Sequence, residues 1–492
     1  AEGWNLPLIE AMACGTPSIY SSCSGQMEFA EGKGLPVKII GEKSTQNNSY
    51  SRYDGMLEDS HVPGNYYEPD FKDLSRVMRD AFKNYTNHKK RSLEEAKFIH
   101  KDFNWDKVAE IGKDTIQEFM DNYIAPPSKP NKIIISYMEG PKVEILGDNY
   151  EEYFIEFINS DNGEVVFSDN ITNNMWTSCG RKYYIPWIIK INGKVVDTLN
   201  LDGKEVLITL ESKSIGDTLA WSPYAVEFAK KHNCKVILST FYNNWFKGLE
   251  VYKDIEWLEP GNSIECDVVY RLGWFKDDEG FWKDFNKHPN QVNLYPIQQT
   301  ATDILGLDYK ELNHGVNFTK GKRPIKDKYI VIGPQSTAGC KEWPYANWVT
   351  LTKILTQKGY KVVNLTKDKI EIPNAINSWN QSFESVANYM LHADLFIGLS
   401  SGLAWFNWAL GKKTLMINGF TSNEHEFQTK VVRVRNESSC NSCWVNPNFK
   451  FDAGDWDWCP IWKNTDKQHI CMKSVTPTQV LNKIKQILNN KK

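Results

Sequence analysis

Two stretches of the chain alternate between apolar strand-like runs and helical patterns, and this alternation constrains the fold most strongly. In the first stretch, the run 205–210 leads into an amphipathic helical pattern at 218–231, and a strand pattern follows at 235–239. The second stretch begins with a strand pattern at 329–333 and continues with a helical pattern at 348–358. Alternating strands and helices form parallel sheets that are covered by helices. The sequence therefore predicts an α/β protein with two Rossmann-like domains facing each other across a cleft.

Other patterns surround these two halves of the 492-residue chain. Short β-type runs separated by Asn, Gly and Asp turns predict a small antiparallel β domain before the first half. A proline-rich linker at 125–130 precedes that domain, and the start of the chain again has an α/β pattern. We therefore expect six parts: a partial Rossmann-like domain at 1–125, the β domain at 131–205, Rossmann-like domains at 206–325 and 328–435, a cysteine-rich segment at 436–475 and a C-terminal helix at 476–492.

Four cysteines lie close together near the end of the chain: Cys440, Cys443, Cys459 and Cys471. Four thiolates can close a tetrahedral shell around one metal ion, and the CxxC spacing directs two sulfurs toward one point. Interleaved aromatic residues suggest a structural clip and not a reactive centre. The cysteines predict a metal finger with four thiolate ligands, and zinc and iron both suit such a set.

The composition excludes some functions. The formal net charge is −3, and such a balance gives no electrostatic reason to expect nucleic acid as a partner. No run of 18 apolar residues is present, so no membrane span is expected. The other six cysteines lack the spacing of a disulfide framework, which favours a reducing, cytoplasmic environment. The chain opens on Ala1 and directly on a motif, which suggests a fragment of a longer protein.

Asp217 is the first candidate for chemistry. It follows the strand run 205–210 and lies at the start of the next helix, where ligands gather in open α/β sheets. A carboxylate at this place can accept a proton from a substrate hydroxyl. The alternative is that Asp217 only caps the helix, with its oxygen bonded to backbone N–H groups.

The loop after the strand 329–333 is the second candidate. It contains Gln335, Ser336, Thr337 and Lys341, which offer amide and hydroxyl groups and one positive charge to a diphosphate. The order of residues is not that of a Walker A loop. The alternative is an ordinary polar turn with a surface lysine.

The third candidate is the turn formed by Ser400, Ser401, Gly402 and Leu403, which connects an apolar strand to a helix. The helix start offers free N–H groups to an anion, and glycine allows the backbone to approach a ligand closely. The alternative is a glycine needed only for packing. The residues 398–402 also match the spacing Gly-x-Ser-x-Gly of hydrolases, but acid and histidine partners in the expected order are not evident, which disfavours that function.

Glu2 and Glu10 form a fourth candidate pair, eight positions apart around a loop and a helix start. Carboxylates so placed can bind sugar or ribose hydroxyls, although a loop acid and a helix-face acid are the simpler interpretation. With residues 11–17 and the Ser-Gly-x-x-Glu pattern at 24–28, they resemble the end of family 4 retaining glycosyltransferases over about 1–122. This resemblance implies that Glu10 contacts the donor ribose. The acceptor half and most of the donor half of such an enzyme are missing.

Residues from about 131 to 490 resemble the bacterial autotransporter heptosyltransferases, which are relatives of the family 9 lipopolysaccharide heptosyltransferases. The resemblance rests on five motifs: 216–219, 335–337 with 340–341, 398–405, 419–421 and 440–444. It implies a GT-B architecture, ADP-heptose as donor, protein hydroxyls as acceptors, Asp217 as base and iron in the finger formed by the four late cysteines. It also implies that Lys341 faces the donor phosphates, with Thr337 and the turn 400–402 nearby. The family 9 lipopolysaccharide enzymes differ at 400–405, which favours the protein-modifying branch.

The expected function is therefore inverting transfer of heptose from ADP-heptose to serine or threonine hydroxyls of an autotransporter passenger. Transfer of another nucleotide-activated sugar is one alternative. A non-catalytic scaffold that binds carbohydrate or protein is the other. Because the resembling enzymes form large rings, a homo-oligomer is also expected.

Overall fold

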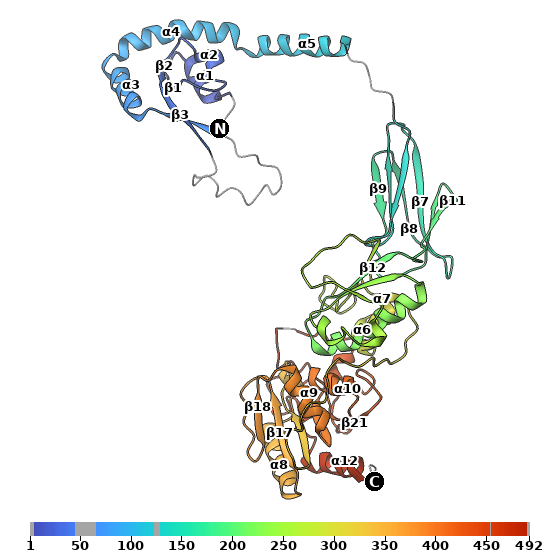
Figure 1. Cartoon of the computed structure of the whole chain (residues 1–492). Coiled ribbons are helices and arrows are strands. Elements are labelled where there is room, and N and C mark those ends of the chain that lie inside the picture. The colour runs from blue at the N-terminus through green and yellow to red at the C-terminus, as the bar shows by residue number, and fades with distance from the viewer. Residues whose placement is uncertain (1–3, 45–64, 123–127, 453, 490–492) are drawn as a thin grey trace. The chain divides into compact units, whose positions relative to one another are not determined.

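The computed structural model describes residues 4–44, 65–122, 128–452 and 454–489 (Figure 1). The chain forms two compact units, Ala1–Pro127 and Ser128–Lys492. Within the described ranges, no helix is both long enough and apolar enough to cross a membrane.

The first unit is a small α/β assembly. Strands β1 (Ile19–Ser21) and β2 (Leu35–Val37) are parallel, and β3 (Ile39–Ser44) pairs antiparallel with β4 (Asn65–Pro69). Leu8, Met12 and Phe29 form its core together with Ile99. The Asn5 side chain caps the first helix by accepting a hydrogen bond from the backbone N–H of Leu8 at 3.3 Å. The helices are α1 (Leu6–Ala13), α2 (Met27–Ala30), α3 (Phe71–Lys83), α4 (Tyr85–Asp102) and α5 (Trp105–Asn122).

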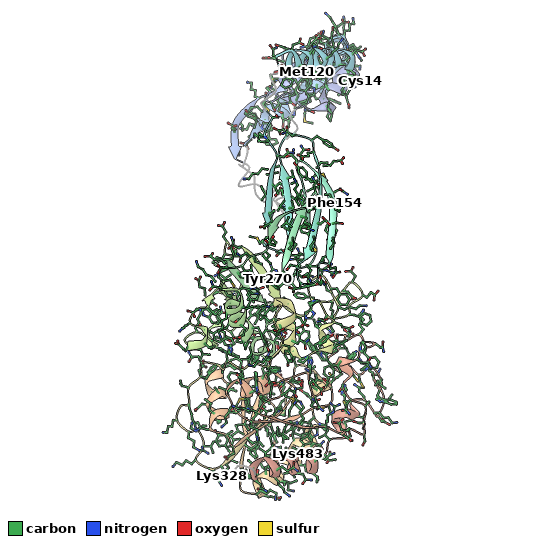
Figure 2. All side chains as sticks on the ribbon, turned by 90° about the vertical axis from the view of Figure 1, so that its right-hand side faces the viewer. Cys14, Met120, Phe154, Tyr270, Lys328 and Lys483 are labelled. Atoms are coloured by element: carbon green, nitrogen blue, oxygen red, sulfur yellow. The ribbon has the colours of Figure 1, made fainter. Side chains whose placement is uncertain are left out.

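The second unit begins with two antiparallel sheets that share one apolar core. Burial alternates along the strands, as expected when one face of each sheet is covered. Ile155 and Phe157 are fully buried, whereas Phe154 (Figure 2), the residue before Ile155, is 40% exposed. The sheets have the orders β5-β6-β9 and β11-β10-β7-β8. The strands are β5 (Lys132–Ser136), β6 (Lys142–Leu146), β7 (Glu152–Asn159), β8 (Val165–Thr172), β9 (Met175–Ser178), β10 (Trp187–Ile191) and β11 (Lys194–Thr198).

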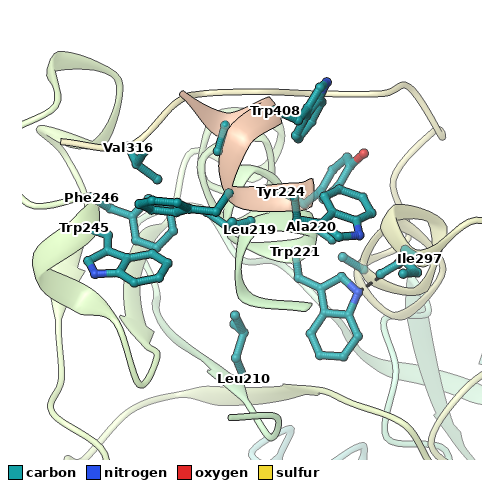
Figure 3. Packing of buried hydrophobic residues seen from close by; sticks show 14 of the residues in the cluster. Leu210, Leu219, Ala220, Trp221, Tyr224, Trp245, Phe246, Ile297, Val316 and Trp408 are labelled. Atoms are coloured by element: carbon teal, nitrogen blue, oxygen red, sulfur yellow. Dashed lines mark hydrogen bonds between the residues drawn. The ribbon is translucent and has the colours of Figure 1, made fainter. Parts of the chain in front are cut away.

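The next layer is a parallel sheet with the order β14-β13-β12-β15. The ring of Tyr270 in β15 (Figure 2) lies 6.3 Å, centre to centre, from the ring of Tyr184, which precedes β10 of the antiparallel sheets. Helix α6 is locked to α7 because the buried Trp221 indole donates a hydrogen bond to the carbonyl of Ile297 at 2.8 Å (Figure 3). The elements are β12 (Glu205–Leu210), α6 (Ile215–His232), β13 (Lys235–Ser239), β14 (Glu256–Trp257), β15 (Val268–Leu272) and α7 (Ile297–Leu305), with 3-10 helices η3 (Asn243–Trp245), η4 (Glu250–Tyr252) and η5 (Val292–Leu294).

The second parallel sheet has six strands in the order β18-β17-β16-β19-β20-β21. The strand order reverses between β16 and β19, and ligands of open α/β sheets bind at such a switch point. The strands are β16 (Tyr329–Gly333), β17 (Lys361–Thr366), β18 (Ile376–Trp379), β19 (Leu395–Leu399), β20 (Thr414–Ile417) and β21 (Val431–Val434). The helices are η6 (Gly339–Lys341), α8 (Tyr345–Gln357), α9 (Phe383–His392), α10 (Gly402–Ala409), η7 (Cys443–Val445), α11 (Ile470–Lys473) and α12 (Pro477–Asn489).

The two parallel-sheet layers share one hydrophobic core. Leu219 and Trp221 of the first layer belong to the same buried cluster as Phe396 and Trp405 of the second. Helices α6 and α10 pack against each other at this junction. This shared core therefore fixes the two parallel-sheet layers relative to each other, and a site at their junction rests on it.

Candidate functional site

A cavity of about 700 Å³ opens where the carboxyl ends of β16, β17 and β18 meet the starts of α6 and α10. This volume lies within the range of roughly 300–1,000 Å³ that is typical of small-molecule sites. The residues that line the cavity at or just after the strand ends are Gln335, Ser336, Thr337, Thr366, Lys367, Asp368, Ser378, Asn380 and Gln381. The helix starts contribute Ser214, Ile215, Ser401, Gly402 and Leu403. The cavity thus contains most of the predicted donor-binding residues.

The starts of α6 and α10 converge on this cavity. A Cβ atom on Gly402 would lie 3.2 Å from the Cβ of Ile215, and one on Gly216 would lie 3.1 Å from Cδ1 of Trp405. Larger residues at these two positions would push the helices apart. Both glycines are therefore needed for packing, as the simpler interpretation of Gly402 proposed. The close approach directs the positive ends of two helix dipoles at one space, which suits an anionic ligand.

Ser400 and Ser401 are neighbours with different surroundings. The Ser400 hydroxyl donates to Glu426, which also accepts a hydrogen bond from the Thr421 hydroxyl at 2.8 Å. The Ser401 hydroxyl is buried and has no hydrogen-bond partner among the described residues, although this residue lines the cavity. A buried polar atom without a partner is uncommon in folded proteins. Ser401 is thus available to a ligand, whereas Ser400 belongs to a buried network beneath the turn.

The loop after β16 contains three predicted donor-binding residues that differ in their contacts. The Gln335 side chain accepts hydrogen bonds from the backbone N–H groups of Lys367 and Asp368, at 2.9 and 3.1 Å, and its amide nitrogen donates to the Asp368 carboxylate. Gln335 therefore ties the loop after β17 to the loop after β16. The backbone N–H of Ser336 donates to Glu342 at 3.1 Å. Thr337 is exposed at the cavity wall.

Asp217 is buried at the third position of α6. Its Oδ2 atom accepts hydrogen bonds from the Ser212 hydroxyl at 2.6 Å and from the Trp274 indole at 2.9 Å. Burial raises the pKa of Asp217 above its usual 3.8, and these two hydrogen bonds and the charge of Lys341 oppose that rise. The alternative that Asp217 caps the helix is wrong, because Ser214 is the N-cap residue. The Asp217 carboxylate instead faces neighbouring side chains.

Lys341 lies at the end of η6 and outside the lining of the cavity. Its ammonium is 5.3 Å from the centre of the Phe420 ring. Its charge lowers the pKa of both Asp217 and His425, so it lies within electrostatic range of both groups. Burial is the main reason why the pKa of His425 falls to about 4, and this histidine is therefore neutral near pH 7. Lys341 thus stands beside the candidate base.

Several residues of the cavity were not found from the sequence. Lys213 and Lys367 bring positive charge to its wall, and Tyr242 and Phe383 contribute aromatic rings that are 6.1 Å apart. Lys367 follows β17 directly, so the rule that ligands bind at carboxyl strand ends identifies it once the strand is known. Tyr242 and Phe383 carry no comparable signal, because aromatic residues at a helix start are usual in any core.

The four late cysteines share one neighbourhood. Burial, together with charge repulsion from neighbouring cysteines of the set, raises the pKa of the Cys443 thiol to about 11 and the pKa of the Cys471 thiol to about 12. In the described ranges, no group of three or more His, Cys, Asp or Glu side chains is arranged to hold a metal ion. The thiols thus lie within electrostatic range but do not form a closed coordination shell. The donor set itself, four thiols, suits a soft metal.

The first unit contains the fourth candidate pair. Glu2 lies outside the described residues, and Glu10 is exposed on α1. The joint action of these two carboxylates and the likeness to family 4 remain predictions.

Comparison with known proteins decides the family. The family model of glycosyltransferase family 9 (heptosyltransferase) matches residues 295–452. The autotransporter heptosyltransferase BAHTCr of Citrobacter rodentium is 30% identical over 382 residues, which cover 73% of this chain and 91% of the relative. The chain belongs to the autotransporter heptosyltransferase family. The prediction of a glycosyltransferase is thereby confirmed.

Two further members of the autotransporter heptosyltransferase family are informative. BimC of Burkholderia thailandensis, named an inactive autotransporter heptosyltransferase, is 31% identical over 62% of this chain and 75% of its own length. The crystal structure of TibC, an iron-containing dodecameric glycosyltransferase from enterotoxigenic E. coli, matches with a TM-score of 0.66 at 26% identity. The match covers 75% of this chain and 100% of TibC, and a second TibC structure is a complex with ADP-D-beta-D-heptose. The expected α/β architecture of this family is therefore confirmed.

Proposed function

We propose that this protein transfers heptose from ADP-heptose to serine or threonine hydroxyls of an autotransporter passenger, with inversion at the anomeric carbon. Family membership and the TibC complex with ADP-heptose support the choice of donor. One observation carries the proposal: α6 brings Ser214 and Ile215 to the cavity and holds the buried Asp217 in the same first turn. A proton acceptor and a nucleotide-sized cavity thus share one helix start.

In the proposed reaction, the acceptor oxygen attacks the anomeric carbon of the heptose. The bond between that carbon and the phosphate oxygen breaks, and ADP leaves with the bonding electrons. The proton of the acceptor hydroxyl passes to the carboxylate of Asp217. A single displacement inverts the anomeric configuration and requires one base and no protein nucleophile. Burial supports this role because it raises the pKa of Asp217 and makes its carboxylate a stronger base.

The departing diphosphate gains negative charge as the bond breaks. We assign its stabilisation to the starts of α6 and α10 and to the unpartnered hydroxyl of Ser401. Lys213 and Lys367 line the same cavity and add positive charge. Lys341 lies within electrostatic range of Asp217 and favours its deprotonated form, which is the form that can accept the proton. In this proposal the region 206–325 binds the acceptor and 328–435 binds the nucleotide-sugar through Gln335, Ser336, Thr337 and the turn residues 401–403, which Ser400 supports from beneath.

We further propose that Cys440, Cys443, Cys459 and Cys471 hold one iron ion in a finger at 436–475. The iron-containing relative TibC supports iron over zinc. An ion bound by four thiolates would supply a structural clip for an irregular segment. Metal analysis of protein purified from its native cells tests this choice. About one iron per chain supports it, and full occupancy by zinc contradicts it.

Two other parts of the proposal rest on likeness. The dodecameric state of TibC supports a homo-oligomer, which light scattering can measure. The segment 1–125 is proposed to be a remnant of a family 4 donor domain in which Glu10 would contact the ribose. If it acts in that way, Glu10→Gln would reduce binding of a nucleotide-sugar by the segment.

A second function has one observation in its favour. The relative BimC is named an inactive autotransporter heptosyltransferase, so loss of catalysis occurs among the relatives of this chain. The two functions differ in what happens to the acceptor protein. We would incubate the full chain and an autotransporter passenger with ADP-heptose, a nucleotide-hexose or no donor, and then measure the passenger mass. A mass gain with ADP-heptose alone supports the proposal, a gain with another donor changes the sugar, and no gain with any donor supports the scaffold.

A further inference from the structure

The loop after β15 reaches the candidate base through Trp274. The Trp274 indole N–H donates to Oδ2 of Asp217 at 2.9 Å, and the Ser212 hydroxyl donates to the same oxygen at 2.6 Å. Two donors on one oxygen fix the plane of the carboxylate, and they leave Oδ1 to accept a proton. The position of the Trp274 ring thus determines the direction in which Asp217 points.

The Trp274 ring is in turn held by a residue of the cysteine-rich segment. The ring centres of Trp274 and Trp444 lie 5.8 Å apart with their planes at 79°, which is a favourable edge-to-face contact. Trp282 lies 6.1 Å from Trp274 and 5.9 Å from Trp444, so the three rings form one cluster. Trp444 directly follows Cys443, one of the proposed metal ligands.

Backbone contacts place Trp444 firmly in this cluster. Its N–H donates to the carbonyl of Phe420 at 3.2 Å, and its carbonyl accepts a hydrogen bond from the Asn293 side chain at 2.7 Å. The indole nitrogen of Trp444 is buried, and none of the described residues forms a hydrogen bond with it. Trp444 therefore acts on Trp274 through the shape of its ring and not through its N–H group.

The same segment also holds Lys341, the cation beside the base. The backbone N–H of Cys340 donates to the carbonyl of Trp456 at 3.0 Å, which ties η6 to the cysteine-rich segment. The Lys341 ammonium lies over the Phe420 ring, and that ring is 5.8 Å from the Trp444 ring. The segment therefore contacts the surroundings of both Asp217 and Lys341.

From these contacts we infer that the cysteine-rich segment positions the catalytic base, through the path Cys443–Trp444–Trp274–Asp217. Trp274 and Trp444 are positioning residues, because they act through Asp217 and not on the substrate. This inference rests on the proposed role of Asp217. It assigns to the four cysteines a second role besides holding an irregular segment together. When they fix the position of Trp444, they also fix Trp274 and, through it, the orientation of the Asp217 carboxylate.

The kinetic test uses the full chain with ADP-heptose and a passenger protein. Trp274→Phe keeps an aromatic ring but removes the donor to Asp217, and Trp444→Ala removes the ring behind it. Each substitution is expected to lower kcat about tenfold or more and to leave KM for ADP-heptose unchanged. A loss of this size is a part of the rate enhancement of about 10²–10⁴-fold that a general base contributes. Trp444→Phe is expected to recover most of the rate that Trp444→Ala loses. Trp462→Ala, in the same segment but with its ring against Lys467, is the control and keeps the parental rate.

The same two tryptophan substitutions, made in protein that already carries Asp217→Asn, separate an effect on the position of the carboxylate from an effect on general stability. If the two tryptophans act through Asp217, Trp274→Phe and Trp444→Ala reduce the residual rate of this background by less than twofold. Reductions as large as in the parental protein would overturn the path, because they would show an effect that does not pass through the carboxylate.

A measurement without catalysis tests the same path. In protein labelled with 5-fluorotryptophan, the fluorine resonance of Trp274 is assigned by its loss in Trp274→Phe. We expect it to shift in Trp444→Ala, in Asp217→Asn and after removal of the metal by a chelator, and to stay in place in Trp462→Ala. An unchanged resonance in Trp444→Ala would overturn the inference. This result is distinct from failure of the proposed function, in which the parental protein itself transfers no heptose.

Discussion

The first residue of α10, Gly402, lies directly against the first residue of α6, Ile215: a Cβ atom on Gly402 would come within 3.2 Å of the Cβ of Ile215. This contact joins the two parallel-sheet layers at the edge of the cavity. It also directs two helix starts at the space that we assign to a diphosphate. The distance between these two residues therefore controls the geometry of the donor site.

Gly402→Ala is expected to weaken ADP binding several-fold, because the added methyl group displaces α10 from α6. Overpacking of this kind also lowers the free energy of unfolding by about 1–3 kcal/mol. Calorimetric titration with ADP and thermal unfolding measure the two effects. Gly112→Ala in α5 is the control, because a Cβ there meets no atom within 4 Å. Parental ADP affinity in Gly402→Ala would contradict this role of the contact.

The neighbouring serines provide a matched pair. Ser401→Ala is expected to weaken ADP binding by about tenfold and to leave the unfolding temperature unchanged, because its hydroxyl has no hydrogen-bond partner in the part of the chain that the structure describes. Ser400→Ala is expected to leave ADP binding unchanged and to lower the unfolding temperature, since its hydroxyl donates to the buried Glu426. Loss of that bond lowers the free energy of unfolding by about 1–3 kcal/mol. Equal effects of both substitutions on ADP binding would refute the assignment of Ser401 to the ligand.

The alternation of strands and helices was sufficient to predict both parallel sheets, because buried parallel strands have continuous apolar runs such as 329–333. The starting points of helices were predicted less well. The helical pattern was expected from 218, but α6 begins at Ile215, because Ser214 caps it and Gly216 fits against Trp405. Only the partner layer explains that glycine, and local sequence does not contain this information.

The candidate site was predicted in part for the same reason. Asp217, the turn at 400–403 and the loop at 335–337 follow strands, and the structure brings them to one side of the fold. Lys341 was expected to face the donor phosphates, but it lies outside the cavity lining and beside Asp217 and Phe420. Trp274 was not predicted at all. Its role depends on a hydrogen bond between distant loops, and 18 tryptophans in the chain offer no signal for choosing one.

Asp217→Asn is expected to stabilise the fold near neutral pH. Burial raises the pKa of Asp217, so the folded protein favours the protonated form, and the stability that this form contributes is lost as pH rises through the folded pKa. Asparagine has no charge to bury, and its oxygen can still accept the bonds from Ser212 and Trp274. The gain is about 0.5–2 kcal/mol near pH 7 and shrinks as the pH falls and the parental carboxylate is protonated. Thermal unfolding at several pH values measures it, and a less stable variant at pH 7 would count against burial as the dominant influence.

Lys341→Met is expected to move the acid limb of the pH–rate profile to higher pH. The Lys341 charge lowers the pKa of Asp217, so its removal raises that pKa further. The base must be deprotonated to act, and activity is therefore lost at a higher pH as the solution is acidified. The pH dependence of kcat/KM measures the shift. Lys473→Met, in α11, is the control for the loss of a positive charge elsewhere. An acid limb that stays in place or moves to lower pH would contradict the claim that the Lys341 charge lowers the pKa of Asp217.

The central claim is that Asp217 accepts the acceptor proton during transfer of heptose from ADP-heptose. The most direct test is a single-turnover reaction in which the passenger mass is followed over time for the parental protein and for Asp217→Asn, with ADP affinity measured for both. We predict that the parental protein adds heptose to the passenger, and that Asp217→Asn adds it about 10²–10⁴-fold more slowly while binding ADP equally well. Transfer by Asp217→Asn at the parental rate would contradict the account.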